Sequence, residues 1–341
     1  MSDKKKIGII LLNTGSAASP HVPDVRAYLK QFLSDPRIID LPAWQRNLIV
    51  YCFILPFRPK KTGEAYEAIW TERGSPLVAF SEDLRDALQA RMPEAIVKIG
   101  MAYGKPRIPD VLDELMAAGI DRILAVPMFP QYASATTGSV VECVYKHCAG
   151  KWNVPALSVL PPFFDDPGFI DAWHAVAAEG LDKFRPDHVL LSYHGLPERQ
   201  VKKCDPSGSH CLQSPDCCER RVPANRMCYR HHCVETSKAL IKRLGLEEGK
   251  YSITFQSRLG RDPWLTPATD ETIVQLAKSG VKRLAVLSPA FVADCLETLE
   301  EIGIQAKESF LEHGGEDYLL LPSLNAHPAW VEALHRLLEE I

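Results

Sequence analysis

The sequence lacks a hydrophobic run long enough to span a membrane. No segment reaches the roughly 18 consecutive apolar residues that a transmembrane helix needs. The N-terminal lysines precede an apolar run, as in a signal peptide, but Ile7–Leu12 is short and no small-residue cleavage site follows it. We therefore expect a first buried strand there. We also expect a cytoplasmic protein whose cysteines are thiols or metal ligands and not disulfides.

An excess of basic residues and the common nucleotide-binding motifs are also missing. With 39 Lys and Arg against 43 Asp and Glu the formal charge is −4, which disfavours nucleic-acid binding. No G-x-G-x-x-G motif follows the first expected strand and no Walker A sequence occurs, so a nucleotide-binding Rossmann enzyme is disfavoured. The absence of Gly-x-Ser-x-Gly weakens a hydrolase interpretation.

What the sequence does contain is a regular alternation of short apolar runs and amphipathic segments. Strands are expected at 6–12, 95–103, 122–128, 155–160, 187–193, 251–256, 282–287 and 317–321. Helices are expected at 21–34, 81–92, 107–118, 167–184, 234–244, 268–279, 295–311 and 327–341. Because these strands are apolar throughout, we predict an α/β fold with doubly wound parallel sheets covered on both faces.

A faint internal repeat divides the chain. Residues 109–131 and 270–291 each combine a helical pattern, a glycine, an arginine and a strand that ends near a proline. We predict two similar Rossmann-like lobes, 1–160 and 161–341, with the C-terminal helix able to pack against the first lobe. In open α/β sheets ligands bind beyond the carboxyl ends of the strands, so functional residues are expected at the strand exits.

Residues 41–66 break the alternation. Their apolar run Leu48–Phe57 is followed directly by Arg58, Lys60 and Lys61. Because prolines and aromatic residues crowd this segment, we expect no regular element but an apolar lip suited to a membrane surface with anionic head groups. A buried strand or helix of the core is the alternative.

The first candidate for chemistry is His194, which follows an apolar strand and precedes Gly195-Leu196-Pro197. An imidazole at a strand exit, where Gly and Pro turn the chain, can act as a general base or as a metal ligand near neutral pH. A hydrogen-bonded structural histidine is the alternative.

The second candidate is an acidic pattern. If 294–302 is helical, Asp294, Glu297 and Glu301 stand at i, i+3 and i+7 and share one face. Inside a cleft such a stripe can bind a hard cation or pass protons, whereas on a surface it is an ordinary solvated helix face.

A third strand exit, 254–267, carries Gln256, Arg258, Arg261 and Trp264. Guanidinium groups there can hold carboxylates of a substrate, and the indole can supply a flat apolar wall. Solvated or salt-bridged loop arginines are the alternative.

Together these motifs resemble those of the ferrochelatase family, whose members insert Fe²⁺ into a porphyrin in the last stage of haem synthesis. The matching stretches are FLSDPRIID, RGSPL, PQYASATTGS, SYHGLPER, FQSRLGRDPWLTP, DCLETLEEI and GGEDYLLLPSLNAHP. They cover nearly the whole chain outside 204–233. The resemblance implies a porphyrin cleft between chelatase-like lobes, protoporphyrin IX and Fe²⁺ as substrates, and peripheral membrane contact through 41–66.

The resemblance also implies roles for single residues. His194 corresponds to the active-site histidine and Glu297 to the essential carboxylate, with Asp294 and Glu301 as a path for protons or metal. The residues expected to line the porphyrin pocket are Asn13, Tyr103, Tyr132, Trp264 and Phe291.

Two further positions qualify the resemblance. Asn13 matches the form usual in enzymes that act on protoporphyrin IX. Cys295 stands where some members have a second histidine, so two-histidine schemes of metal transfer do not carry over.

The implied chemistry fits these residue types. Metallation removes two pyrrole N–H protons from a flat ring, and a pocket that bends the ring exposes its nitrogens and lowers the barrier. We expect His194 to accept these protons while Glu297 and its neighbours serve the other face. The reverse assignment, with His194 presenting iron, stays open.

Six of the ten cysteines lie within 204–233, an insertion relative to shorter family members. Structural zinc sites usually have two close pairs of cysteines, and only Cys228–Cys233 comes near that spacing. A [2Fe–2S] cluster tolerates looser spacing and some ferrochelatases carry one, so we expect a cluster with a stabilising or sensing role. Its ligands are expected to be four of Cys211, Cys217, Cys218, Cys228 and Cys233, with Cys204 in reserve. Zinc and free thiols are the alternatives.

Two other functions are open to this sequence. A chelatase that handles cobalt or nickel with a more polar substrate shares the fold, but the apolar segment 41–66 disfavours it. A non-catalytic haem or porphyrin carrier with a redox-sensing cluster is disfavoured because His194 and the carboxylates occur together. Both a monomer and a homodimer are compatible with the sequence.

Overall fold

The computed structural model describes residues 6–258, 260 and 262–341. Arg261, considered above, lies outside the described residues. The chain divides into two compact units. The first holds the residues up to Phe129, Ser134–Pro162 and Leu334–Ile341, and the second holds Pro130–Ala133 and Phe163–Ala333.

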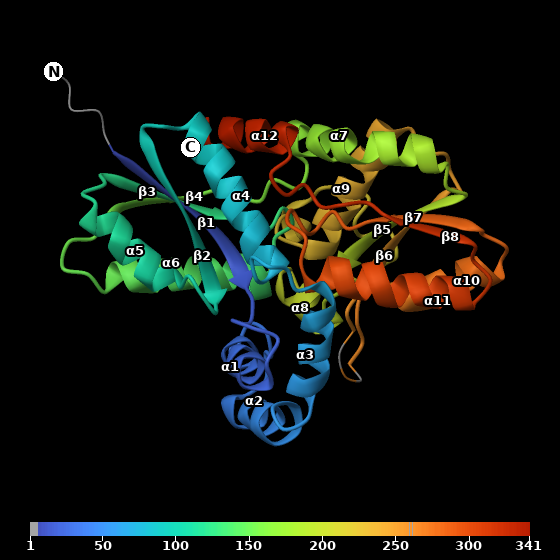
Figure 1. The fold of residues 1–341 in the computed structure, drawn as a ribbon, viewed down its shortest axis with the longest axis horizontal. Helices are drawn as coiled ribbons and strands as arrows, with labels where there is room; N and C mark the ends of the chain where they lie inside the picture. Colours follow the sequence, from blue (N-terminus) through green and yellow to red (C-terminus); the bar gives the residue numbers. More distant parts are fainter. Residues whose placement is uncertain (1–5, 259, 261) are drawn as a thin grey trace. The chain divides into compact units, whose positions relative to one another are not determined.

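In the first unit a parallel sheet has the strand order β2-β1-β3-β4 (Figure 1). Its strands are β1 (Ile7–Gly15), β2 (Ala95–Tyr103), β3 (Arg122–Pro127) and β4 (Ala156–Val159). Ile10 and Leu12 of β1 pack in one core cluster with residues of α5 (Ile108–Ala117) and α6 (Ser139–Ala149). Ile9 and Leu11 alternate to the opposite face and are also buried, which explains why β1 is apolar throughout.

The other helices of this unit include the segment that breaks the alternation. They are α1 (Val22–Leu33), α2 (Ala43–Leu48), the π-helix η1 (Ile49–Ile54), α3 (Arg58–Ile69), α4 (Pro76–Arg91) and the π-turn η2 (Ser134–Gly138). The prediction that 41–66 forms no regular element is therefore wrong. Its prolines lie where helices tolerate them, because Pro42 precedes α2 and Pro59 lies in the first turn of α3.

The second unit repeats the plan with a parallel sheet in the order β6-β5-β7-β8. Its strands are β5 (His188–His194), β6 (Tyr251–Gln256), β7 (Arg283–Leu287) and β8 (Asp317–Leu320). Its helices are α7 (Pro167–Phe184), α8 (Glu198–Lys203), the 3₁₀ turn η3 (Pro223–Asn225), α9 (Tyr229–Leu244), α10 (Thr269–Lys278), the π-helix η4 (Glu297–Ala306) and α11 (Lys307–Glu312). The last helix, α12 (Pro328–Glu339), contributes residues to both units.

The two sheets have the same order when the strands of each unit are counted along the chain. The repeated segments 109–131 and 270–291 contain α5–β3 and α10–β7, which are the helix and third strand of their units. The predicted α/β class with two parallel sheets is confirmed. In the second unit β5 and β6 are neighbours and pair His194 with Gln256 at their carboxyl ends, where the candidate site lies.

Candidate active site

His194 is the last residue of β5, and the chain turns immediately after it. The N–H of Gly195 donates to the carbonyl oxygen of Gln256 at 2.8 Å. A Cβ atom on Gly195 would lie 2.7 Å from that oxygen and 3.2 Å from Cε3 of Trp264. Only glycine therefore permits the close approach that holds this strand exit.

The imidazole of His194 has a defined tautomer. Its Nδ1 lies 2.6 Å from the carbonyl oxygen of Gly195. Because a carbonyl oxygen only accepts, Nδ1 carries the hydrogen and Nε2 is the basic nitrogen of the neutral ring. The side chain is partly exposed, and the ring of Phe291 has its centroid 6.4 Å away. His194 thus has its acceptor nitrogen Nε2 free of the Gly195 contact and lies beside an aromatic side chain.

Two carboxylates stand on the π-helix η4 at its first turn. Glu297 is the first residue of η4, and Glu301 follows on nearly the same side of a helix closed by i to i+5 hydrogen bonds. Ser257 donates to Glu301 twice, from its N–H at 2.8 Å and from its hydroxyl at 2.5 Å. Gln256 Nε2 donates to the carbonyl oxygen of Glu297 at 2.9 Å. The exit of β6 therefore fixes both carboxylate residues.

The electrostatics connect these groups with the histidine. Burial raises the pKa of Glu301, and the negative charge of Glu297 raises it further, whereas the hydrogen bonds from Ser257 and the charge of His194 lower it. His194 pairs with Gln256 at the strand ends, and Gln256 Nε2 donates to the carboxylate of Glu301 at 3.2 Å and to the carbonyl oxygen of Glu297. The histidine and both glutamates therefore lie around the same strand exits. Because its pKa is raised, Glu301 holds a proton at a higher pH than an ordinary glutamate, as a proton-relay group needs.

The three predicted carboxylates do not belong to one helix, because Asp294 lies before η4. This residue precedes η4 and is 3% exposed. Its carboxylate accepts hydrogen bonds from Asn325 Nδ2 at 2.8 Å and from Thr298 Oγ1 at 3.0 Å, with the N–H of Ser323 at 3.2 Å as a further donor. Asp294 therefore anchors the chain before the helix, and its part in a path for protons or metal stays a prediction.

The loop after β6 packs on the turn that follows His194. The N–H of Leu265 donates to the carbonyl oxygen of Leu196 at 3.0 Å. Trp264, the residue before Leu265, is partly buried. The predicted apolar wall thus lies beside the histidine turn. Arg258 forms ion pairs with Asp270 and Glu271 at 3.0 and 2.9 Å, as in the salt-bridged alternative.

The remaining predicted pocket residues belong to other elements. Asn13 and Tyr103 belong to the first unit, at the carboxyl ends of β1 and β2. The hydroxyl of Tyr103 donates to Asp35 at 2.6 Å, and burial together with this carboxylate raises the pKa of the phenol. Tyr132 belongs to the second unit, and its N–H donates to Nδ1 of His232 at 3.1 Å.

The expected cluster ligands form a buried group of free thiols. They are Cys211, Cys217, Cys218, Cys228 and Cys233, each between 0 and 6% exposed. The sulfur atoms of Cys217 and Cys218 lie 3.8 Å apart, and the Cys228 thiol raises the pKa of Cys218. Burial raises the pKa of Cys211 to about 11. Cys204 instead donates to the carbonyl oxygen of Gln200 at 3.5 Å.

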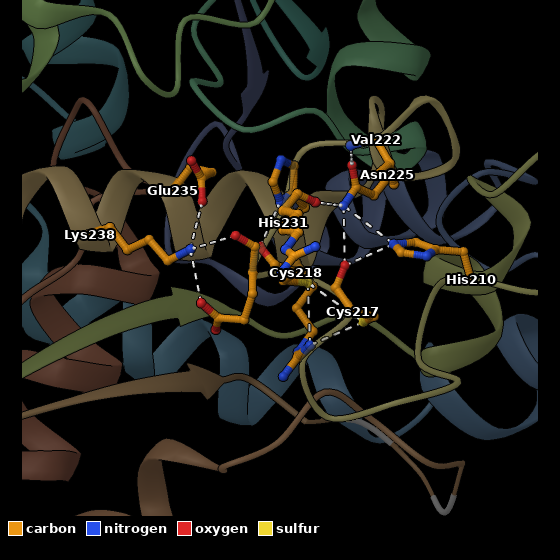
Figure 2. A network of polar contacts seen from close by, with 11 residues as sticks. His210, Cys217, Cys218, Val222, Asn225, His231, Glu235 and Lys238 are labelled. Carbon is orange, nitrogen blue, oxygen red and sulfur yellow. Dashed lines mark hydrogen bonds and ion pairs between the residues drawn. The ribbon is translucent and has the colours of Figure 1, made fainter.

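Two polar residues that the sequence analysis did not single out hold this insertion. The carboxylate of Asp205 accepts from the N–H of Cys211 at 3.0 Å. The amide of Asn225 donates to the carbonyl oxygen of Cys217 at 3.2 Å and accepts from the N–H of Val222 at 2.9 Å (Figure 2). Asp and Asn in turn-rich segments are the signal that could have identified them, because their short side chains bond nearby backbone.

Donors are directed at two of the sulfur atoms. Arg230 Nη1 lies 3.5 Å from Sγ of Cys217 and 3.3 Å from Sγ of Cys218, and the N–H of Leu212 points at Cys217 at 3.4 Å. Such donors favour the thiolate, the form that binds metal, but the pKa of Cys217 is still raised by burial and that of Cys218 by the Cys228 thiol and burial. Within the described part of the chain, however, no three His, Cys, Asp or Glu side chains are already arranged to hold a metal ion.

Helices α2 and η1, with the residue that precedes α3, expose a group of large apolar side chains. Trp44 is 66% exposed, Phe53 62% and Phe57 75%, whereas Val50 on the inner side is buried. Arg58, Lys60 and Lys61 of α3 are exposed next to them. Across the described residues, no helix combines the length and hydropathy that a membrane crossing requires.

Comparisons with known proteins identify the family of this chain. The family model described as Ferrochelatase matches residues 6–341. A Ferrochelatase of Pseudomonas entomophila (strain L48) is 46% identical over 327 residues, 96% of each chain, and one of Coxiella burnetii (strain Dugway 5J108-111) is 43% identical over 338 residues, 99% of this chain and 94% of that protein. The structure of SirB from Bacillus subtilis with Fe³⁺ covers 98% of this chain and 95% of its own, with a TM-score of 0.55 at 12% identity, which shows the fold alone. The chain therefore belongs to the ferrochelatase family.

Proposed function

We propose that this protein is a lyase that inserts Fe²⁺ into protoporphyrin IX and so forms protohaem in the final step of haem biosynthesis. The observation that carries the proposal is His194, with Nε2 as its basic nitrogen, paired with Gln256, whose side chain contacts both Glu297 and Glu301. Family membership supports it, because relatives named Ferrochelatase align over nearly the whole chain. The family resemblance adds Asn13, Tyr103 and Tyr132 to the porphyrin pocket.

The reaction exchanges two pyrrole protons for one Fe²⁺ without a net redox change. His194 accepts a proton at Nε2, while Glu301 takes up and releases a proton close to Glu297. The aromatic side chains of Phe291 and Trp264 supply apolar surface against which the macrocycle is held and bent, which exposes its nitrogens to the metal. In this proposal His194 is the base, Glu301 relays protons, and Phe291 and Trp264 line the porphyrin pocket.

Turnover distinguishes this proposal from the alternatives. Anaerobic incubation with protoporphyrin IX and Fe²⁺ is expected to replace the absorption spectrum of the free porphyrin with that of haem, repeatedly per enzyme molecule. A carrier binds the porphyrin but produces no more haem than a protein-free control. A chelatase for cobalt or nickel turns over with those ions and a more polar tetrapyrrole but not with Fe²⁺ and protoporphyrin IX.

We further propose that the buried thiols bind a [2Fe–2S] cluster. What supports this proposal is that five free thiols of the insertion are buried and that Arg230 offsets the negative charge that thiolates bring. Cys211, Cys218, Cys228 and Cys233 are the proposed ligands, with Cys217 as the substitute for its neighbour Cys218. Because insertion of Fe²⁺ into the porphyrin transfers no electrons, the cluster would not take part in the reaction. When bound, it would cross-link the insertion or make the protein sensitive to oxidants.

The cluster proposal predicts a coloured protein. Anaerobically purified protein is expected to absorb between roughly 300 and 600 nm and to contain about two irons and two sulfides per chain. Cys228→Ser is expected to remove both features, whereas Cys52→Ser, at an exposed cysteine outside the insertion, keeps them. A colourless wild-type protein with stoichiometric zinc would reject the cluster in favour of a zinc site.

We also propose that the protein is cytoplasmic and contacts anionic membranes through the aromatic group on α2 and η1. Replacing Trp44, Phe53 and Phe57 together with serine is expected to weaken binding to phosphatidylglycerol-containing vesicles by at least about tenfold, because each large side chain contributes over a kcal/mol when it leaves water. Sedimentation with vesicles measures this loss. Trp152→Ser is the matched control, because Trp152 is 97% exposed outside that group. Equal binding by the triple variant and wild type contradicts the proposal.

A further inference from the structure

The backbone carbonyl of His194 has a hydrogen-bond donor from the cysteine-rich insertion. Tyr229 begins α9 and donates its hydroxyl hydrogen to this oxygen at 2.8 Å. The tyrosine is 5% exposed and lies between Cys228, a buried thiol, and Arg230, which contacts two sulfur atoms. One buried hydroxyl therefore joins the insertion to the residue proposed as the base.

This bond holds one end of the peptide unit between His194 and Gly195. The other end is held by the N–H of Gly195, which donates to the carbonyl oxygen of Gln256 at 2.8 Å. The orientation of this unit determines where the carbonyl of Gly195 lies, and that carbonyl accepts Nδ1–H of His194 at 2.6 Å. A glycine has little conformational preference of its own, so external partners must fix the turn.

We propose that Tyr229 is a positioning residue that sets the tautomer of His194 through this peptide unit. The inference rests on the proposed role of His194 as proton acceptor. Without the hydroxyl, the peptide unit is held only through Gln256, and the carbonyl of Gly195 can move away from Nδ1. The ring then also populates the tautomer with hydrogen on Nε2, which cannot accept a pyrrole proton at that atom.

A second hydroxyl between the same elements provides a matched control. Tyr193, adjacent to His194 on β5, lies 2.8 Å from the hydroxyl of Ser237 on α9 and is fully buried. Its removal loosens the same strand–helix contact without touching the His194–Gly195 peptide unit. Tyr229→Phe and Tyr193→Phe thus lose equivalent buried hydroxyls, and only the first affects the proposed path.

The test is the imidazole ¹⁵N spectrum of protein labelled at histidine, in which the two tautomers have separate shifts. The His194 signals are assigned by their loss in His194→Ala. Wild type and Tyr193→Phe are expected to show Nδ1–H alone, and Tyr229→Phe a mixture of both tautomers. In the iron-insertion assay Tyr229→Phe is expected to lower kcat by about tenfold or more, with KM within about twofold, because the base and not the binding surface is misplaced.

Each outcome decides the inference. A single Nδ1–H tautomer in Tyr229→Phe overturns it, and so does an equal mixture in both variants, because general loosening of α9 then explains the effect. If His194→Ala metallates porphyrin at the wild-type rate, the base role fails, while the ¹⁵N spectra of Tyr229→Phe still decide whether the tyrosine sets the tautomer.

Discussion

Replacing His194 with alanine is expected to lower kcat for iron insertion by about 10²- to 10⁴-fold, the usual contribution of a positioned general base. The ring nitrogen Nε2 is the basic atom of this site, since Nδ1–H is already donated to Gly195. Initial rates of haem formation under anaerobic conditions measure the loss. KM for porphyrin is expected to change little, because the aromatic side chains of Phe291 and Trp264 remain.

His194→Gln separates proton transfer from hydrogen bonding. A glutamine can still donate to the carbonyl of Gly195 but has no basic nitrogen, so its kcat is expected to fall as far as that of the alanine variant. His313→Ala, at an exposed histidine of the same unit, is expected to keep wild-type kcat. Full activity of His194→Gln together with loss in His194→Ala contradicts the base assignment and leaves only a positioning role for the side chain.

The sheets could be predicted because burial acts on every residue of their strands. Ile9 to Leu12 are all buried between helices, so the pattern is continuous apolar, which is how parallel strands appear in a sequence. The segment 41–66 was less transparent. Pro42 and Pro59 are tolerated because the first precedes a helix and the second lies in the first turn of another. The sequence pattern alone does not show where these helices begin.

The acidic residues show what the spacing of residues in the sequence cannot predict about a site. Glu297 and Glu301 were expected to share a face and do so, but on a π-helix that α-helical spacing does not describe. Asp294 lies before this helix, and its hydrogen-bond partners Asn325 and Ser323 are about thirty residues away along the chain. Long-range hydrogen bonds of this kind leave no periodic signal.

Tyr229 is a residue whose contact with the candidate site could not be predicted from the sequence. Within the insertion, attention to cysteine spacing treats the residues between the thiols as spacers. The hydroxyl of Tyr229 nevertheless reaches the carbonyl of His194, 35 residues earlier in the chain. The cysteine spacing predicted a cluster-binding insertion and gave no reason to consider the residues between the thiols. The hydrogen bond from Tyr229 to the end of β5 is seen only in the three-dimensional structure.

Glu297→Gln is expected to lower kcat for iron insertion by about 10²-fold or more, because the amide has nearly the same shape but carries no charge and takes up no proton. Glu300→Gln is the matched control. Glu300 lies on the same helix, and its carboxylate accepts from Gln305 at 2.7 Å on the exposed side. Similar rates for the two variants would mean that the overall charge of η4, and not the carboxylate at position 297, supports the reaction.

The same variant is expected to change the pH dependence of stability. The folded-state pKa of Glu301 lies above its ordinary value of 4.5, so its contribution to stability is fully present below that value and is lost as the pH rises through the raised one. Part of this rise comes from the negative charge of Glu297, so Glu297→Gln lowers the pKa of Glu301 and reduces the loss. The difference in urea midpoint between about pH 4 and about pH 7 is therefore expected to be smaller in Glu297→Gln than in wild type. An unchanged difference would show that the two carboxylates do not interact, and the proton relay between them would have to be abandoned even if kcat falls.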